Sequence, residues 1–215
     1  MTKIWLKFDG IKIMKNLDFR LGLIDDWEQV KSLYVKSFPS YERQPVSLIK
    51  DRIQANVCKL YVLSEAEECV GFALLWQFEE NEVIFIEYLA VNPKFRGKGY
   101  GKEIMRRIIS LTKSLMFKLV LEIENPTMGT NKNQREKRYV FYKELGLTEV
   151  NGINYQLPPI SSKKSTPMYL MVYPANYKFE KELLIRIVQE LYESVYNRKN
   201  NDVFLKEIIS SIHNE

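Results

Sequence analysis

Three alternating glycines, Gly97, Gly99 and Gly101, lie between a strongly β-forming run at 83–91 and a segment with helical periodicity. That segment carries one apolar stripe, made of Ile104, Met105, Ile108 and Leu111. A second β-forming run follows at 118–123. Two strands joined through a helix in this way are parallel, because parallel strands need a crossover of about a dozen residues or more. The glycines thus mark the centre of a strand–loop–helix–strand unit.

Further strands and helices are predicted on both sides of this unit. Short connections join the runs at 60–63, 70–78 and 83–91, which favours antiparallel neighbours. The other expected elements are a strand at 17–24, a helix capped by Asp25 and Asp26 and stopped by Pro39, a helix from Pro45 to about Lys59, a helix at about 133–145 ended by Gly146, strands near 147–156 and 167–173, and helices at 179–197 and around 204–212. The pattern predicts an α/β (α+β) fold with a mixed central sheet of about seven strands flanked by helices.

Composition restricts the class of protein. The chain has 215 residues, of which 46% are hydrophobic and 27% charged, and no apolar run approaches the length of a membrane span. We expect a folded protein with no membrane partner and, by default, a cytoplasmic location. The net charge is +5, but basic and acidic residues interleave and no nucleic-acid-binding signature is present. Nucleic acid is therefore not an expected partner.

Two cysteines and one histidine leave little nucleophilic or metal chemistry. Cys58 and Cys69 are too few for a disulfide framework or a thiolate metal cage. His213 lies in a predicted terminal helix, far from the glycines in sequence. We therefore expect no metal site and no Ser–His or Cys–His nucleophile.

We expect three segments along the chain. Residues 1–16 precede the first predicted strand and form an N-terminal extension. Residues 17–176 contain the sheet and its helices. Residues 177–215 form a helical extension that packs on the core or on a partner chain, so a homodimer is one arrangement that the sequence allows.

The glycine loop has the chemistry of a phosphate site. Glycine permits positive φ and close approach of the backbone to a ligand, and the free N–H groups of a helix's first turn favour an anion. Arg96 and Lys98 add positive charge. A dinucleotide fingerprint would need a third glycine where Lys102 stands, and a P-loop would need Ser or Thr where Gly99 stands. A tight turn without a ligand is the remaining alternative for the glycines alone.

The segment Val91-Asn-Pro-Lys-Phe-Arg-Gly-Lys-Gly-Tyr-Gly101 resembles the acyl-coenzyme A loop of the GNAT N-acetyltransferase superfamily. The family pattern is Gln/Arg-x-x-Gly-x-Gly/Ala, and Arg96, Gly99 and Gly101 fill its fixed places. The segment Phe141-Tyr142-Lys-Glu-Leu-Gly146-Leu147 is similar to the family's late Tyr-x-x-x-Gly-Phe motif. The order of elements from about residue 17 to 174 also resembles this fold.

This resemblance implies acetyl-CoA as co-substrate and direct attack of an amine on the thioester. It implies that the amides of 97–101 hold the pyrophosphate, that a bulge at 89–91 exposes backbone groups to the pantetheine arm, and that Tyr142 protonates the thioester sulfur. The implied cofactor-binding residues are Leu89, Ala90, Val91, Arg96, Gly97, Lys98, Gly99, Tyr100, Gly101, Lys102, Arg138 and Tyr142. Many relatives have asparagine and alanine where this chain has Arg135 and Arg138, which puts the usual asparagine contact in doubt.

The acceptor ammonium must lose a proton, and the candidate bases are carboxylates. Glu87 lies on the strand that leads to the loop, where alternation places it on one face with Phe85 and Leu89. Glu42 lies between the first two helices, and Glu124 is a third candidate. A water chain without a dedicated base is the remaining option.

The acceptor itself is a small-molecule or peptide amine that the sequence does not specify. Phe38, Tyr41 and Glu42 favour a cationic small amine if they line its site. The alternative function is a non-catalytic module of the same fold that binds coenzyme A or a protein partner.

Overall fold

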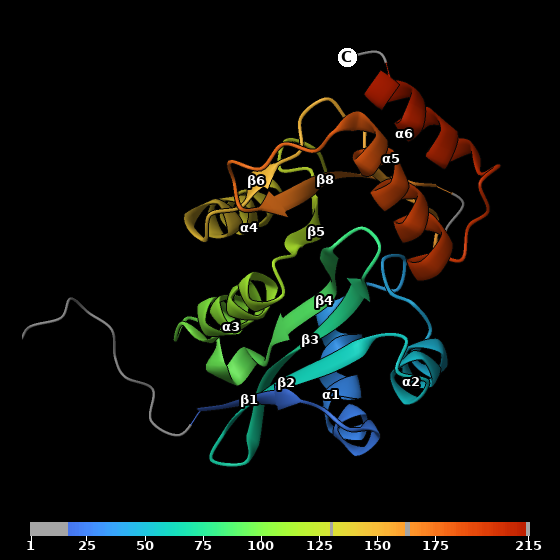
Figure 1. Ribbon diagram of the computed structural model, residues 1–215. Helices are drawn as coiled ribbons and strands as arrows, with labels where there is room; N and C mark the ends of the chain where they lie inside the picture. The colour runs from blue at the N-terminus through green and yellow to red at the C-terminus, as the bar shows by residue number, and fades with distance from the viewer. Residues whose placement is uncertain (1–16, 130, 162–163, 214–215) are drawn as a thin grey trace, which may run out of the picture.

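The computed structural model describes residues 17–129, 131–161 and 164–213, so the predicted extension at 1–16 lies outside the described residues (Figure 1). The elements in chain order are β1 (Leu17–Leu21), α1 (Ile24–Ser37), α2 (Val46–Gln54), β2 (Lys59–Glu65), β3 (Glu68–Phe78), β4 (Val83–Val91), the 3₁₀ turn η1 (Pro93–Phe95), α3 (Tyr100–Ser114), β5 (Lys118–Glu124), α4 (Lys132–Glu144), β6 (Thr148–Glu149), β7 (Gln156–Leu157), β8 (Thr166–Tyr173), α5 (Lys181–Glu190), the π-helical turn η2 (Leu191–Val195) and α6 (Val203–His213).

The strands form one mixed sheet in the order β1-β2-β3-β4-β5-β8-β6, and β7 pairs with β8 beside it. The antiparallel pairing of β2, β3 and β4 and the parallel pairing of β4 and β5 across α3 are as the sequence predicts, and β1 adds a further antiparallel pair with β2. The eight strands and their flanking helices confirm the predicted α/β class. The parallel pairing covers only Val83–Ile86 and Lys118–Leu121, although both strands continue beyond it.

Helices cover both faces of the sheet and create two apolar layers (Figure 1). On one face, α1, α2, α5, η2 and α6 bury side chains against the sheet, among them Trp27, Ile49, Ile187 and Ile208. On the other face, α3 and α4 pack over Leu75, Ile86 and Leu121. The C-terminal helices therefore share a core with the sheet, and they lie on the face opposite α3.

The first helix begins one residue before the predicted acidic cap. Leu23 is the N-cap residue, and Asp26 instead accepts a hydrogen bond from the Leu23 N–H at 2.7 Å. The Asp26 carboxylate also pairs with Arg20 at 2.7 Å. Asp26, which the sequence predicts to cap the helix, is therefore a residue of its first turn, and its carboxylate accepts the hydrogen bond of the Leu23 amide.

Two predicted boundaries are wrong for identifiable backbone reasons. The second helix ends at Gln54 rather than near Lys59, since Asn56 has φ of 55° and Lys59 already pairs in β2. The single strand expected at 147–156 is replaced by the two-residue strands β6 and β7. Gly152, at φ of 75°, lies in the turn between them.

Candidate active site

A groove opens where the pairing of β4 and β5 ends. It encloses about 520 Å³ and is lined by the end of α1, by β4 and β5 beyond their paired segment, and by α4. On the side of β5, residues 87–91 of β4 have no strand partner, so their main-chain groups there, apart from the Val91 carbonyl that accepts from Arg96, are available to a ligand. Seven predicted site residues line this groove together: Glu87, Leu89, Ala90, Val91, Arg96, Arg138 and Tyr142.

The bulge in β4 lies at Glu87, not at the predicted 89–91. Leu74 is opposite Tyr88 and Leu75 is opposite Ile86, so Glu87 is the extra residue. Residues 89–91 pair regularly with β3. The bulge also corrects the predicted faces, because Tyr88 joins Phe85 on the α1 side while Leu89 packs on the α3 side.

The loop before α3 presents a row of free amides directly after Arg96, the one residue of the loop that lines the groove. Gly97 and Gly99 have φ of 76° and 91°, and nothing lies within 4 Å of where a Cβ on Gly97 would stand. The N–H groups of 97–102 donate no hydrogen bond to any described residue. Because these amides open the 15-residue helix α3, they form a site suited to a diphosphate such as that of coenzyme A.

Three side chains of the loop segment make contacts within the protein. Arg96 Nε donates to the Val91 carbonyl at 3.1 Å, and Lys98 Nζ lies 5.4 Å from the centre of the Phe95 ring. Tyr100 is buried and donates its hydroxyl hydrogen to Glu65 at 2.5 Å. Main-chain amides rather than the Tyr100 side chain are thus the groups available to an anion.

A smaller chamber adjoins the groove at its inner end. It has a volume of about 70 Å³ and shares Phe38, Glu87, Glu122 and Arg138 with the groove. We call it the inner chamber; its other lining residues are Glu42, Tyr88, Glu124, Leu157, Met168 and Tyr196. Four carboxylates and apolar walls meet there, an environment that suits a small cation.

Glu87 is fixed in the wall of the groove and the inner chamber by donors on the α1 side of the sheet. Its side chain is only 2% exposed, and it accepts hydrogen bonds from Trp76 Nε1 at 2.6 Å and from Arg52 at 3.5 Å. Arg52 also stacks on the Trp76 ring at 5.0 Å. Burial raises the pKa of Glu87 to about 7, while Trp76 and Arg52 act in the opposite direction.

Glu122 is a site residue that the sequence did not reveal. It lies on β5, just past the last residue paired with β4, and lines both cavities. Its two carboxylate oxygens accept hydrogen bonds from the Tyr155 and Tyr196 hydroxyls. Burial raises the pKa of Glu122 to about 7, and the two tyrosines oppose this rise. The strand register would have been the only signal for it.

The other two acidic candidates differ in their partners. Glu42 Oε1 is buried and has no hydrogen-bond partner among the described residues, and burial together with Glu124 raises the pKa of Glu42. Glu124 is paired with Arg135 at 2.6 Å and with Arg138 at 3.1 Å. The two arginines that depart from the family pattern are therefore bound to a carboxylate.

The predicted aromatic residues divide between the site and the surface. Phe38 lines both cavities, whereas Tyr41 is 49% exposed and lines neither. Tyr142 is buried in the wall of the groove, and its hydroxyl has no hydrogen-bond partner in the described part of the chain. Burial raises the pKa of Tyr142, so it stays protonated and able to donate a hydrogen bond at neutral pH.

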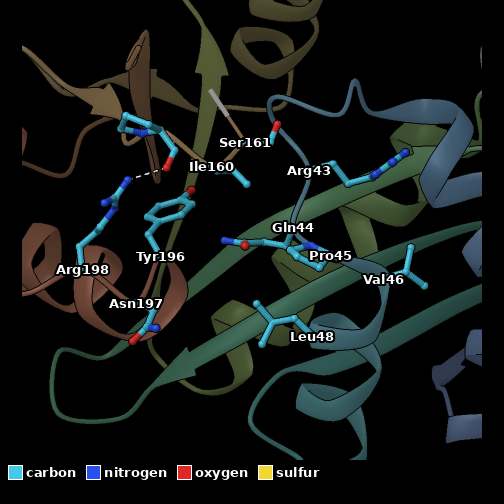
Figure 2. A pocket seen from close by; sticks show the side chains of 11 residues that line it. Arg43, Gln44, Pro45, Val46, Leu48, Ile160, Ser161, Tyr196, Asn197 and Arg198 are labelled. Atoms are coloured by element: carbon cyan, nitrogen blue, oxygen red, sulfur yellow. Dashed lines mark hydrogen bonds between the residues drawn. The ribbon is translucent and has the colours of Figure 1, made fainter. Parts of the chain in front are cut away.

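Another cavity, of about 430 Å³, shares Tyr196 with the inner chamber (Figure 2). The α1–α2 connection, residues 159–161 and the chain after η2 line it. Tyr196 is a wall of both this cavity and the inner chamber. Gln44 crosses it to donate to the Val195 carbonyl at 3.3 Å, so the C-terminal segment is bonded to the helix connection at this point.

The groove, the free amides and the fold together define an acyl-coenzyme A transferase architecture. The model of the acetyltransferase (GNAT) family matches residues 27–146, which is more than half of the chain. The chain belongs to this family, a class of acetyl-CoA-dependent acetyltransferases, as its two motifs predict.

Individual relatives agree with this assignment. A solved "Putative acetyltransferase from GNAT family" of Bacteroides thetaiotaomicron is 26% identical, with a TM-score of 0.70 over 85% of this chain and 99% of that one. "Putative acetyltransferase YjbC" of Bacillus subtilis is 23% identical over 57% of this chain, and the match spans 60% of that protein. The spermidine N-acetyltransferase of Vibrio cholerae, solved with CoA and spermine, shares the fold at 16% identity, with a TM-score of 0.56 over 73% of this chain and 94% of that one.

Two further findings concern the described residues only. Within those ranges, no helix has both the length and the apolar character to span a bilayer. In the same part of the chain, no group of three histidine, cysteine, aspartate or glutamate side chains is arranged to bind a metal ion.

Proposed function

We propose that this protein transfers an acetyl group from acetyl-CoA to a primary amine by direct attack on the thioester. The observation that carries this proposal is a groove that has Arg96, the residue before the free amides of 97–102, in its lining, follows the unpaired edge of β4, and shares Glu87 and Glu122 with the inner chamber. In this proposal the cofactor, the reacting carbonyl and the amine would bind in that order along the groove and the inner chamber.

Acetyl-CoA would bind along the groove. The amides of 97–102 would hold the diphosphate, with Arg96 and Lys98 adding charge near it. The free main-chain groups of 87–91 would bind the amides of the pantetheine arm and polarise the thioester carbonyl. The buried Ser37 Oγ, which lines the groove without a partner, is a further group that a bound arm would satisfy.

The amine would enter the inner chamber as an ammonium. At pH 7 an alkyl ammonium of pKa about 10.4 is only about 0.04% neutral, and deprotonation costs about 4.6 kcal/mol. Glu87, Glu42 and Glu124, the predicted acidic candidates, line the chamber. Of these, Glu87 and Glu42 would bind the cation and assist its deprotonation. Tyr142 would then protonate the thiolate as it leaves.

The shape and lining of the chamber support an unbranched alkyl amine as the acceptor. Its volume of about 70 Å³ admits the end of an unbranched aminoalkyl chain rather than a bulky group. Apolar Phe38, Leu157 and Met168 would contact the methylenes, and the carboxylates would contact the ammonium. The Vibrio cholerae relative named for spermidine is consistent with an acceptor of this kind.

Two measurements test the proposal. Isothermal titration should give saturable binding of acetyl-CoA, and absence of heat at millimolar ligand would refute the groove assignment. Release of free thiol should then occur with one or more members of a panel of alkylamines, polyamines, amino acids and lysine peptides. Binding without release across the panel would instead favour the coenzyme-binding module.

A further inference from the structure

Two buried carboxylates face each other at the point where β4 and β5 separate. Val83 pairs with Lys118 and Ile86 pairs with Leu121, so the next residues on the two strands are Glu87 and Glu122. Both line the groove and the inner chamber, and their charges interact. The two carboxylates differ in the chemistry of the groups that hold them.

Glu87 is held only by groups that donate hydrogen. The Trp76 indole N–H at 2.6 Å and the Arg52 guanidinium at 3.5 Å occupy its two oxygens, and neither can accept a hydrogen bond. A proton added to Glu87 would therefore point at another donor, or would break one of these bonds. These partners favour the ionised form of Glu87. Burial raises the pKa of Glu87 to about 7, as it does that of Glu122, so the distinction between the two carboxylates depends on the chemistry of their hydrogen-bond partners.

Glu122 is held only by groups that can either donate or accept. Its partners are the hydroxyls of Tyr155 and Tyr196, and a hydroxyl can rotate its hydrogen away and accept one instead. Glu122 can thus gain a proton and keep its hydrogen bonds. Because each proton state is satisfied, the site allows repeated protonation and deprotonation at one position.

We propose that Glu122 is the group that accepts the proton of the acceptor ammonium, and that Tyr155 and Tyr196 are its positioning residues. Glu87 acts as the fixed anion that binds the cation. Tyr196 follows η2 in the C-terminal extension, so that extension completes the acceptor site. This inference rests on the proposed acetyl transfer and assigns a proton acceptor within it.

The step balances without any further reactant. The ammonium gives one proton to the Glu122 carboxylate, which becomes a carboxylic acid, and the amine lone pair then forms the new C–N bond while the C–S bond breaks. The second amine proton leaves the new amide as the thiolate is protonated. Glu122 returns its proton to solvent before the next turnover.

The groups that face Glu122 support a proton affinity in the neutral range. Burial raises the pKa of Glu122 to about 7, and the tyrosine hydroxyls oppose this rise. The remaining charged or titratable side chains that line the two cavities are Lys36, Glu42, Glu87, Tyr88, Arg96, Glu124, Arg138 and Tyr142. Arg52 pairs with Glu87, and Arg135 pairs with Glu124. A base with this affinity is partly ionised at neutral pH and can take up a proton there.

The test compares Glu122→Gln with a matched control. Glu149→Gln changes another carboxylate that accepts hydrogen bonds from a tyrosine, Tyr139, but it lies outside the groove and the inner chamber. With 1,4-diaminobutane and acetyl-CoA, the kcat of the parent should rise through an inflection near pH 7. Glu122→Gln should lower kcat at neutral pH by about 100-fold and remove this inflection, while Glu149→Gln should leave both unchanged.

Tyr196→Phe tests the positioning role. Loss of one donor to the carboxylate should move the kcat inflection to higher pH by about one unit, and the rate should recover at alkaline pH. A merely structural role would lower the rate equally at every pH. An unshifted inflection in Tyr196→Phe, or an inflection retained by Glu122→Gln, would overturn the proposal.

An infrared titration of the free protein separates this proposal from the proposed function. The carboxylic acid C=O band of the parent should disappear as the pH rises through about 7, and the band should be absent in Glu122→Gln but present in Glu87→Gln. A band that is retained in Glu122→Gln and absent in Glu87→Gln would reject Glu122 as the proton acceptor, even if the enzyme is active. If no amine supports thiol release, the acetyl-transfer proposal fails, and the proton-acceptor role fails with it, whatever the infrared result.

Discussion

Gly101 provides a test that separates cofactor binding from folding. It is the second residue of α3 and, unlike Gly97 and Gly99, it has no positive φ. A Cβ built there would lie 3.7 Å from the nearest atom of Val91 and 3.8 Å from that of Phe141, which are ordinary contacts. The fold therefore tolerates a side chain at position 101, and two side chains of similar size but different charge can be compared there. The matched pair is Gly101→Asp and Gly101→Asn.

Gly101→Asp should be more stable than Gly101→Asn but should bind CoA more weakly. Aspartate in the first turn of a helix is favourable by about 0.3–1 kcal/mol, so Gly101→Asp should be the more stable of the two. If the diphosphate binds these amides, the added carboxylate lies close to it. At about 6 Å and an effective dielectric constant of about 40, repulsion from two phosphate charges costs about 2.8 kcal/mol, or about 100-fold in affinity.

The assay is titration calorimetry with CoA, paired with denaturant unfolding of the same samples. Gly101→Asp should bind CoA about 100-fold more weakly than Gly101→Asn while unfolding at the same or a higher denaturant concentration. Added salt should narrow the difference in affinity, because it screens exposed charges. Equal affinities in the two variants would refute the diphosphate assignment, since they differ mainly in charge at one position.

Three other perturbations test separate parts of the structure. Tyr142→Phe should lower turnover at least several-fold while leaving CoA affinity unchanged in calorimetry, because its hydroxyl has no partner within the described residues; equal turnover would limit the residue to packing. Trp27→Ala should cost about 3–5 kcal/mol in denaturant unfolding, since α1 buries this side chain completely against the sheet, and a loss below 1 kcal/mol would contradict that burial. Arg20 and the Leu23 N–H lower the pKa of Asp26 in the folded state. They therefore stabilise the folded protein at pH values above 3.8, the usual pKa of an aspartate, and this stabilisation is lost as the pH falls below that value. Asp26→Asn should therefore destabilise the protein at neutral pH but progressively less in acid, and a pH-independent loss would argue against the ion pair.

Local patterns in the sequence predict much of the sheet and of the cofactor loop. Apolar alternation with short connections predicts the antiparallel strands, and the glycine spacing predicts a loop that opens α3. These features depend on residues that are close in sequence. The boundaries fail where a positive φ at Asn56 or Gly152 ends an apolar pattern early, because propensity alone does not reveal which residue adopts the turn.

The inner chamber depends on contacts between distant segments, which local patterns do not report. Tyr155 precedes β7, and Tyr196 follows the π-helical turn of the C-terminal extension. Both reach Glu122 on β5 because α5, η2 and α6 pack on the same face as α1. An amphipathic stripe predicts that these helices are packed, but it does not say which face of the sheet they cover.

Glu122 and Glu124 show why the choice of base needs the structure. They are separated by one residue on β5, point to the same face, and are equal candidates by residue type. The register of β5 on β4 places Glu122 at the end of the paired segment, between two tyrosine hydroxyls. Glu124 lies two residues further along and forms ion pairs with Arg135 and Arg138. The predicted candidate is thus neutralised by cations, whereas its neighbour has partners that permit a proton to arrive and leave. A difference of about 6–7 Å along one strand therefore separates a structural ion pair from a group suited to proton transfer.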